Sequence, residues 1–331
     1  MLPGDSLVEG TVMKLNLYAK LTDKLGRSRN TVERYISNGP MKYKVYTIPK
    51  RTSGQRVIAH PAKKLKIIQR ALVSVLEPHL KIHHKAMAYR KGLGIKDNAV
   101  LHRENEYLLK LDFSDFFNSI TPELFINYCM QNDIILSTAE KNLLIKTFFW
   151  NKTKKNDGKL VLSVGAPSSP FISNTIMYFF DEAIDEYCIT KNITYSRYAD
   201  DLTFSTPDKN VLFHIPTLVK KQLGIIFSNQ ITINDFKTIF SSKAHNRHVT
   251  GVTINNDGEI SIGRERKRLI SSLIHKFILG QLDIEHIRYL QGLLSFATDI
   301  EPKFKSRMIS KYSNQVIENL IKFRGSDEQA N

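Results

Sequence analysis

Cysteine is nearly absent from this sequence: 331 residues contain only two, Cys129 and Cys188, which lie far apart in apolar surroundings. Such a pair forms neither a disulfide framework nor a cysteine zinc signature, so we expect two buried thiols in a reducing cytoplasm. The ten histidines show no ligand pattern either. The strings His83-His84 and His245-x-x-His248 have no cysteine or carboxylate at metal-binding spacing, which favours structural roles for them.

Long apolar runs are also missing, and no stretch is long enough to span a bilayer. No basic amphipathic anchor stands apart from the globular pattern, and Met1–Ser6 lacks the basic and apolar regions of a secretory signal, so we expect no membrane partner. Acidic residues are scarce relative to basic ones: 32 against 48 leave a net charge of +16. This balance favours a polyanionic partner such as nucleic acid, with a merely solvated basic surface as the alternative.

The rest of the composition is that of an ordinary globular protein, with 42% hydrophobic and 24% charged residues. The length allows two or three subdomains. Strand-like and helix-like segments are mixed up to about residue 262, and only helical patterns follow from Arg264. This order predicts an α+β body with a helical appendage. Residues 325–331 have the composition of a disordered tail.

Local patterns predict several elements that matter below. Residues 11–38 look helical with a break near 25–28, and strands at 43–48 and 55–60 flank a turn at 51–54. Pro61 suits the first position of a helix, and apolar residues at helical spacing follow it. Further predicted elements are a strand at 107–112, a strand at 159–164, a long helix ending near 191, a helix at 208–223 and a strand at 249–254.

The string Tyr198-Ala199-Asp200-Asp201 places two adjacent carboxylates between two strand-like runs, 193–197 and 202–205. Two acidic side chains at a hairpin tip repel each other, and a hard divalent cation such as Mg²⁺ would offset that repulsion. The alternative is a polar turn, in which Asp is common.

Asp112 ends the predicted strand 107–112, where it could also be a helix N-cap or a turn residue. Together with the Asp200-Asp201 hairpin it can bring three carboxylates onto adjacent strands. Two Mg²⁺ ions about 4 Å apart on such a trio can bridge an attacking oxygen and a phosphate leaving group. In a strongly basic protein this predicts a nucleotidyltransferase that acts on nucleic acid.

Four strings in order make the sequence resemble the reverse transcriptases. Residues 112–117 resemble their motif A, Gly165-Ala166-Pro167-Ser168-Ser169-Pro170 resembles motif B, 198–201 resembles the Tyr-x-Asp-Asp motif C, and Asn234-x-x-Lys237-Thr238 resembles motif D. Two further strings are similar to elements of bacterial retron reverse transcriptases: Asn98-Ala99-Val100-Leu101-His102 and Val249-Thr250-Gly251. The resemblance covers about residues 30–320.

This resemblance implies a right-hand polymerase. N-terminal helices and fingers would occupy residues 1–105, the palm 106–262 with part of the fingers inserted at about 132–165, and a helical thumb with its short tail 263–331.

It also implies roles for the residues of the catalytic centre. Asp112, Asp200 and Asp201, with the main-chain carbonyl of Phe113, would hold two Mg²⁺ ions, for which Mn²⁺ could substitute. Lys237 would lie near the triphosphate, either as a general acid or in a salt bridge.

The nucleotide pocket carries further expectations. Phe117 would exclude a 2′-hydroxyl from the incoming dNTP, with a core aromatic as the alternative. Gly165 and Ala166 would line the pocket, where small residues allow close approach. Val164 stands where many reverse transcriptases have a Gln that touches the nucleotide. The triphosphate would be gripped by basic side chains, although the two lysines among them fit general backbone binding nearly as well: Arg56, Lys63 and Lys64.

Contacts with RNA are expected from motif membership and from a basic helix that begins at residue 264, with a solvated basic helix as the alternative. The residues concerned are Asn98, His102, Val249, Thr250, Gly251, Arg264, Arg266, Lys267 and Arg268.

The resemblance further implies that the enzyme copies a cognate structured non-coding RNA in the bacterial cytoplasm. Synthesis would start at a guanosine 2′-hydroxyl and give branched RNA–DNA, and the enzyme would serve phage defence with an effector protein. Two alternatives remain open. One is a reverse transcriptase of the group II intron or diversity-generating type; the other is a non-catalytic RNA-binding scaffold or antitoxin, which the net charge fits equally well.

Overall fold

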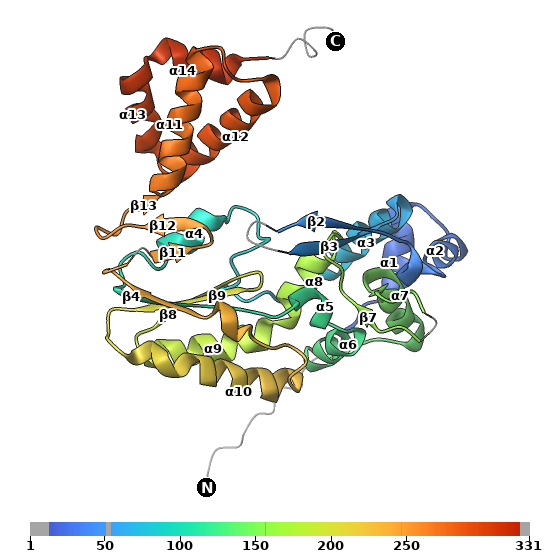
Figure 1. Cartoon of the computed structure of the whole chain (residues 1–331). Helices are drawn as coiled ribbons and strands as arrows, with labels where there is room; N and C mark the ends of the chain where they lie inside the picture. The colour runs from blue at the N-terminus through green and yellow to red at the C-terminus, as the bar shows by residue number, and fades with distance from the viewer. Residues whose placement is uncertain (1–12, 51–53, 156, 246, 325–331) are drawn as a thin grey trace.

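A four-stranded antiparallel sheet forms the centre of the structure, which is a computed structural model that describes residues 13–50, 54–155, 157–245 and 247–324. The strand order is β10 (Ile239–Ser242), β4 (Tyr107–Asp112), β9 (Asp201–Thr206) and β8 (Thr194–Tyr198). The predicted strand at 107–112 and the two strands around the Asp-Asp pair are confirmed. Helices α9 (Tyr178–Thr190) and α10 (Ile215–Phe227) lie along one face of this sheet (Figure 1).

A hairpin and a group of helices form the part predicted as fingers. Strands β2 (Tyr43–Pro49) and β3 (Gln55–Pro61) pair along their whole length, and next to them lie α1 (Leu17–Leu25), α2 (Arg29–Ile36), α3 (Lys63–Leu76) and α7 (Thr138–Phe148). The predicted break at 25–28 is confirmed: Gly26 ends α1 with a φ of 57°, and Ser28 caps α2. The predicted turn at 51–54 falls on 51–53, outside the described residues, apart from Gly54.

The prediction that Pro61 opens a helix is wrong. Pro61 ends β3, where it pairs with Tyr43, and α3 begins two residues later at Lys63. Proline is tolerated at the end of a ladder because it has no N–H to donate to a further partner.

The helix predicted to end near residue 191 consists of two helices, α8 (Ser169–Ile176) and α9, with Met177 between them. The predicted strand at 159–164 is reduced to β7 (Leu160–Val161), which pairs with β6 (Trp150–Asn151). The residues after β7 form a loop toward α8. Other short elements of this region are α5 (Phe116–Ser119), α6 (Pro122–Gln131) and the parallel pair β1 (Met13–Lys14) and β5 (Ile134–Ile135).

Three short strands lead into the C-terminal helices: β11 (Arg247–Val249), β12 (Val252–Ile254) and β13 (Ile260–Ser261). The predicted strand at 249–254 is therefore interrupted, because Thr250 and Gly251 turn the chain with φ values of 47° and 79°. The helical patterns from Arg264 onward are confirmed as α11 (Arg264–Ile278), α12 (Ile284–Ile300), α13 (Pro302–Tyr312) and α14 (Asn314–Lys322). The predicted disordered tail, 325–331, lies outside the described residues.

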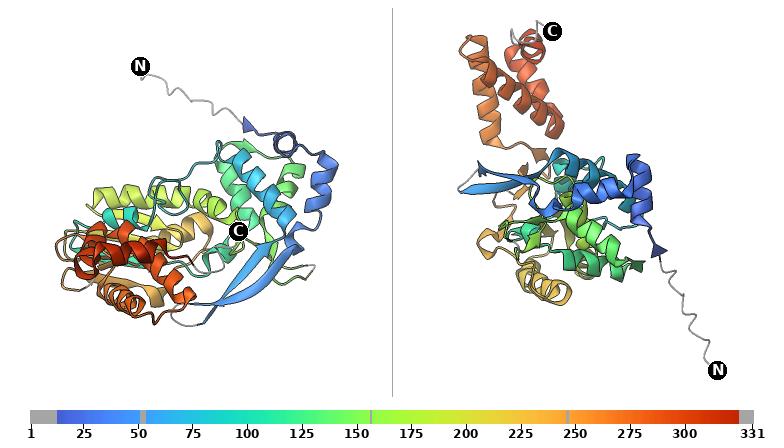
Figure 2. Two further views of the ribbon diagram at one scale, coloured as in Figure 1. Left: turned by 90° about the horizontal axis from the view of Figure 1, so that it is seen from above. Right: turned by 90° about the vertical axis from the view of Figure 1, so that its right-hand side faces the viewer.

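Two separate hydrophobic clusters stabilise the chain. The larger one joins the fingers helices to the central sheet and includes Phe113, Phe180 and Phe204, all buried. The smaller one joins the four C-terminal helices to β11–β13 and to α4 (Ile95–Val100). The right-hand view of Figure 2 shows the C-terminal helices as a body of their own above the rest, as Figure 1 does. The clusters thus group residues 247–262 with the helices that follow, whereas the predicted palm–thumb boundary falls at 262/263.

The α+β class predicted from the order of elements is confirmed, with helices packed around several small sheets, most of them antiparallel. Two 3-10 helices flank α10, namely η2 (Val211–His214) before it and η3 (Asp235–Lys237) after it. The predicted helix at 208–223 thus lies later, at η2 and α10. No helix in the described part of the chain has both the length and the apolar character needed to cross a membrane.

Candidate active site

Three carboxylates meet at one end of the central sheet. The register of β4 and β9 places Asp112 directly opposite Asp201, and Asp200 lies in the two-residue turn that joins β8 to β9. The N–H of Phe113 donates to the carbonyl of Asp200 over 3.0 Å, which ties the chain after β4 to this turn. Opposite residues of antiparallel strands have Cβ atoms about 4.5–5.5 Å apart, so the trio shares one small region.

A buried arginine, Arg197, stabilises the hairpin turn by hydrogen bonding. Ala199 has a φ of 58°, a region that non-glycine residues rarely occupy. The carbonyl of Ala199 accepts a hydrogen bond from Arg197 over 3.0 Å, and Arg197 also donates to Asn174 over 3.1 Å. Arg197 is fully buried and pairs with the equally buried Asp181 over 2.6 Å. This network fixes the backbone that presents Asp200.

The carboxylates of the trio are electrostatically strained. Burial, followed by the neighbouring carboxylates, raises the pKa of Asp201 to about 6 and also raises the pKa of Asp200. Lys237 partly compensates, since its Nζ lies 2.8 Å from Oδ1 of Asp112, and this hydrogen bond raises the pKa of Lys237. A set of carboxylate oxygens that repel one another fits a hard divalent cation such as Mg²⁺. Two roles were predicted for Lys237, a general acid and a salt bridge, and the structure contains the salt bridge.

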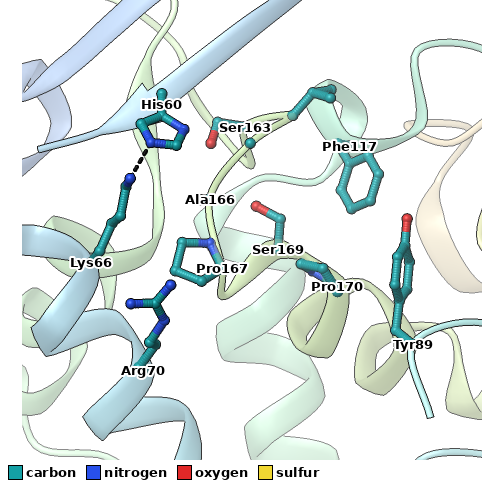
Figure 3. A pocket seen from close by; sticks show the side chains of 12 residues that line it. His60, Lys66, Arg70, Tyr89, Phe117, Ser163, Ala166, Pro167, Ser169 and Pro170 are labelled. Carbon is teal, nitrogen blue, oxygen red and sulfur yellow. Dashed lines mark hydrogen bonds between the residues drawn. The ribbon is translucent and has the colours of Figure 1, made fainter. Parts of the chain in front are cut away.

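A pocket of about 260 Å³ lies near the trio (Figure 3): burial, followed by the charge of Asp200, raises the pKa of Tyr89, one of its lining residues. It brings together Phe117, Gly165 and Ala166, three of the predicted nucleotide-binding residues, and Val164 lies in the same wall. The phenyl ring of Phe117 is half-buried and its centre lies 5.6 Å from that of Phe116, so it contacts both the pocket and the core.

The pocket needs glycine at position 165 because β3 lies too close for a side chain there. A Cβ added to Gly165 would lie 3.0 Å from Ile58 Cγ2 and 3.1 Å from the carbonyl oxygen of Ala59, and its φ is 122°. The N–H of Ala59 donates to the carbonyl of Val164 over 2.9 Å. The loop from 163 to 168 is therefore fastened to β3 of the fingers hairpin, which forms one wall of the pocket.

The predicted triphosphate grip is only partly placed at this pocket. Arg56 is exposed on β3, and its charge lowers the pKa of Asp200, so it faces the trio. Lys63 and Lys64 are not among the lining residues, and Nζ of Lys64 instead lies 4.9 Å from the ring centre of Tyr35.

Sequence reasoning missed the basic residues that do line the pocket, Lys66 and Arg70. Their i,i+4 spacing places both on one face of α3, and Lys66 also contacts His60 (Figure 3). That spacing shows that the two residues share a face, but the packing of α3 in the fold decides that this face is the one toward the pocket.

Tyr89 was missed as well and lines the same pocket. Its φ is 61° although it is not glycine, and its side chain is 53% exposed, which is unusual for a large aromatic ring. The carbonyl of the preceding Ala88 accepts a hydrogen bond from the buried Asn174 over 2.9 Å. The network under the hairpin turn therefore also positions Tyr89. A strained exposed aromatic next to a carboxylate trio is typical of a functional position, but no local sequence signal marks it.

The prediction that Asn98 and His102 contact RNA is contradicted by their burial, since neither side chain is exposed. Oδ1 of Asn98 accepts a hydrogen bond from Ser196 over 2.7 Å, and the two ring nitrogens of His102 lie 2.8 Å from Ser196 and 2.7 Å from Ser205. Burial lowers the pKa of His102 to about 3, so the ring stays neutral. Both residues fasten the segment 98–102 to the central hairpin.

Val249, Thr250 and Gly251 also make contacts within the framework, although Gly251 itself is exposed. Val249 is buried, Thr250 donates to the carbonyl of Ile95 over 3.2 Å, and the carbonyl of Gly251 accepts from Arg266 over 2.6 Å. RNA contact by Val249 is contradicted by its burial. The string 249–251 joins α4 to the start of α11, which makes it part of the joint between the sheet and the C-terminal helices.

The basic residues at the start of α11 divide into two pairs. Arg264 and Arg268 are exposed, so their side chains are available to a polyanion. Arg266 lies over the ring of Phe296 and binds Gly251, and Lys267 pairs with Glu301 over 2.8 Å. Residues of α11 and α13 together line an open groove, and its basic members are Lys267, Arg268, His275, Arg307 and Lys311.

Comparison with known proteins gives a consistent result. The family model described as reverse transcriptase (RNA-dependent DNA polymerase) matches residues 48–254. The chain is 51% identical over 281 residues to the Retron Ec83 reverse transcriptase of Escherichia coli, covering 85% of this chain and 90% of that protein. It is 35% identical to the Retron Ec73 reverse transcriptase of Escherichia coli, covering 86% and 92% of the two chains.

Among solved structures, the chain is similar to the telomerase from Candida albicans in complex with a fragment of telomeric RNA. The TM-score is 0.49 at 13% identity, and the match covers 88% of this chain and 62% of that one.

Proposed function

We propose a specific reaction for this chain, which belongs to the retron reverse transcriptases and is an RNA-directed DNA polymerase. Its template is RNA, and we propose that this is a cognate structured non-coding RNA in the bacterial cytoplasm. Synthesis starts from the 2′-hydroxyl of a guanosine in that RNA and extends with dNTPs. The product is DNA joined to RNA through a branch.

The main support for the proposal is that Asp112 and Asp201 lie opposite each other on β4 and β9, with Asp200 in the adjoining turn. These three side chains, with the main-chain carbonyl of Phe113, are the groups that would hold two Mg²⁺ ions. When bound, the ions neutralise the oxygen charges of the attacking hydroxyl and the leaving pyrophosphate. Burial and then the neighbouring carboxylates raise the pKa values of Asp200 and Asp201, and bound cations would offset both costs of the charged form.

The side chains around the trio bind and orient the nucleotide. Lys66 and Arg70 present positive charge to the pocket from α3, and the charge of Arg56 on β3 acts on Asp200 of the trio. The ring of Phe117 offers a 2′-hydroxyl neither a hydrogen-bond partner nor space, which favours dNTPs over ribonucleotides. Lys237 is protonated at neutral pH, as lysines ordinarily are, and its hydrogen bond with Asp112 raises its pKa further, so it is a charged donor next to this carboxylate.

The exposed cations of the C-terminal helices support binding of the RNA backbone. Arg264 and Arg268 lie on α11, and Arg307 and Lys311 lie across the groove on α13. The net charge of +16 acts in the same direction. We further propose that the enzyme works with an effector protein in phage defence, as the retron family membership implies.

The test uses the purified full chain with its cognate RNA, Mg²⁺ and the four dNTPs. We expect DNA that migrates with the RNA until a 2′–5′ debranching enzyme releases it. The variant Asp200→Asn/Asp201→Asn should make none, and the exposed Asp257→Asn should behave as wild type because it removes one acidic charge away from the trio.

Three outcomes would overturn the proposal. Absence of DNA under these conditions, with no difference between wild type and the double variant, excludes the reaction. DNA that forms only on an added primer and never joins the RNA favours the group II intron type. Full RNA binding and full biological function in Asp201→Ala favours the non-catalytic scaffold or antitoxin.

A further inference from the structure

A second group of potential metal ligands lies outside the polymerase site. Among the residues that the structure describes, His83, His84 and Asp185 are the one set of three whose ligand atoms all lie within 4.8 Å of one another. The sequence places no carboxylate at metal-binding spacing from His83-His84, but the fold supplies Asp185 from a distant segment. We propose that these three residues form a binding site for a transition-metal ion of the zinc type.

Both ligand-bearing segments are fixed to the same strand. The N–H of Arg197 in β8 donates to the carbonyl of Lys85 over 2.8 Å, and the N–H of Met87 donates to the carbonyl of Arg197 over 2.7 Å. Ala86 forms a parallel bridge with Arg197, so the segment after the two histidines runs beside β8 as a short extra strand. Asp185 projects from α9, which packs on β8 as well. The ligands are thus held together without a metal.

The two histidines differ in exposure and complement each other as ligands. His83 is 7% exposed, and burial lowers its pKa, which favours the neutral imidazole that binds metal. His84 is exposed, and its Nε2 lies 3.2 Å from Oδ2 of Asp185. The ring centres are 4.3 Å apart. Because His84 is exposed to solvent, a small rotation of its ring can bring a ring nitrogen to roughly 2.0–2.1 Å from a bound zinc ion, which is the usual Zn–N distance.

The surroundings provide room and a further oxygen ligand. The three residues lie in the wall of an open pocket of about 610 Å³ that Glu182 and Glu186 also line. Glu182 comes from the same helix as Asp185, one turn earlier. Two imidazoles and one carboxylate leave one position for Glu182 or water, as in four-coordinate zinc sites. Imidazole ligands select zinc, cobalt or nickel over magnesium, which distinguishes this set from the all-oxygen trio of the polymerase site.

Two lysines oppose the ion: Lys81 lines the same pocket, with its Nζ 6.0 Å from the ring centre of Tyr178, and Lys85 pairs with Asp185. Nζ of Lys85 lies 3.6 Å from Oδ1 of Asp185, on the oxygen that does not face His84. The side chain of Lys85 is 24% exposed, so it can move toward solvent when a cation binds. The competing interpretation is a plain ion pair between His84 and Asp185, which needs a protonated imidazole. A metal site instead strengthens with pH, since its imidazoles must be neutral.

The experiment measures zinc bound to the RNase-treated full chain after dialysis at pH 8, with Mg²⁺ in excess to fill oxygen-ligand sites. We expect one equivalent of Zn²⁺ in wild type. In His84→Ala and in Asp185→Asn the affinity should fall more than roughly tenfold. The control is His286→Ala, because His286 is an exposed histidine that pairs with Asp283 over 2.7 Å. This control should bind zinc as wild type does.

Folding is checked by thermal unfolding in the absence of metal. His84 is exposed, so His84→Ala should have the melting temperature of wild type. Asp185→Asn can be destabilised by the loss of its pairing with Lys85, and in that event the zinc affinity of His84→Ala alone tests the proposal. Added Zn²⁺ should raise the melting temperature of wild type but not of His84→Ala. The proposal is overturned if wild type binds no zinc, or if His84→Ala binds it as tightly as wild type. Neither result would bear on the polymerase site, whose pocket shares no lining residue with this one.

Discussion

The buried pair of Arg197 and Asp181 should decide both the stability of the palm and the position of the hairpin turn. Neither side chain is exposed, and the guanidinium makes three contacts with the carboxylate, at 2.6, 2.8 and 3.2 Å. Replacing Asp181 by Asn leaves a buried positive charge without its counter-charge. Breaking a buried pair in this way costs about 3–5 kcal/mol. At roughly 2–4 °C per kcal/mol for a large domain, the melting temperature should fall by about 10 °C.

A double replacement separates stability from positioning. In Asp181→Leu/Arg197→Met both charges are gone, so most of the lost stability should return, because an apolar pair of similar volume can substitute for a buried ion pair. The polymerisation rate should remain low, since the carbonyl of Ala199 and Oδ1 of Asn174 have lost their donor. The control is Glu259→Gln, which breaks the exposed pair with Lys303 and should melt with wild type.

The assays are thermal unfolding and the single-turnover rate of nucleotide addition at saturating Mg²⁺ and dNTP. Two results would refute the reasoning. If Asp181→Asn melts together with Glu259→Gln, the buried pair does not stabilise the palm. If the stable double variant polymerises at the wild-type rate, Arg197 is not a positioning residue for the turn that carries Asp200.

Four further predictions concern the pocket and the trio. The pKa of Asp201 is raised to about 6, so its protonated form stabilises the fold at low pH and that contribution is lost as the pH rises through 6. Without divalent ions, Asp201→Asn should therefore melt above wild type at pH 8, and a gap that persists at pH 4 would contradict this. Phe117→Ala should raise ribonucleotide incorporation relative to dNTP by roughly tenfold or more, judged from kcat/KM ratios; unchanged discrimination would make Phe117 a core residue only. Lys237→Gln should lower the rate of nucleotide addition by about 10²-fold. Lys237→Arg should lower this rate less, since it keeps the positive charge near Asp112. An equal drop in rate in both variants would argue against a charge effect. Tyr89→Gly should melt no lower than wild type, because glycine accepts a φ of 61°, yet should raise the KM for dNTP; a much lower melting temperature would make Tyr89 a packing residue.

Local sequence signals were sufficient for most of the fold and for the core of the site. Alternating and helical patterns located β2, β3, β4 and the C-terminal helices, because these elements have one buried face with a regular period. The Asp200-Asp201 hairpin was recognisable because two short strands flank a two-residue turn. The failures came at interruptions, such as the turn at Thr250 and Gly251, where positive φ angles are set by contacts with distant residues.

The sequence by itself thus determined an α+β nucleotidyltransferase, because its acidic residues occupy positions defined by short-range strand and turn patterns, and the resemblance of its motifs added the reverse transcriptase type. Only the tertiary structure decided which basic residues of α3 face the pocket, that Tyr89 enters it, and that Asn98 and His102 are buried. It alone brought Asp185 to His83 and His84. The physical reason is the same in each case: burial and side-chain contact depend on segments that are distant in the chain, and no local period encodes which of them will meet.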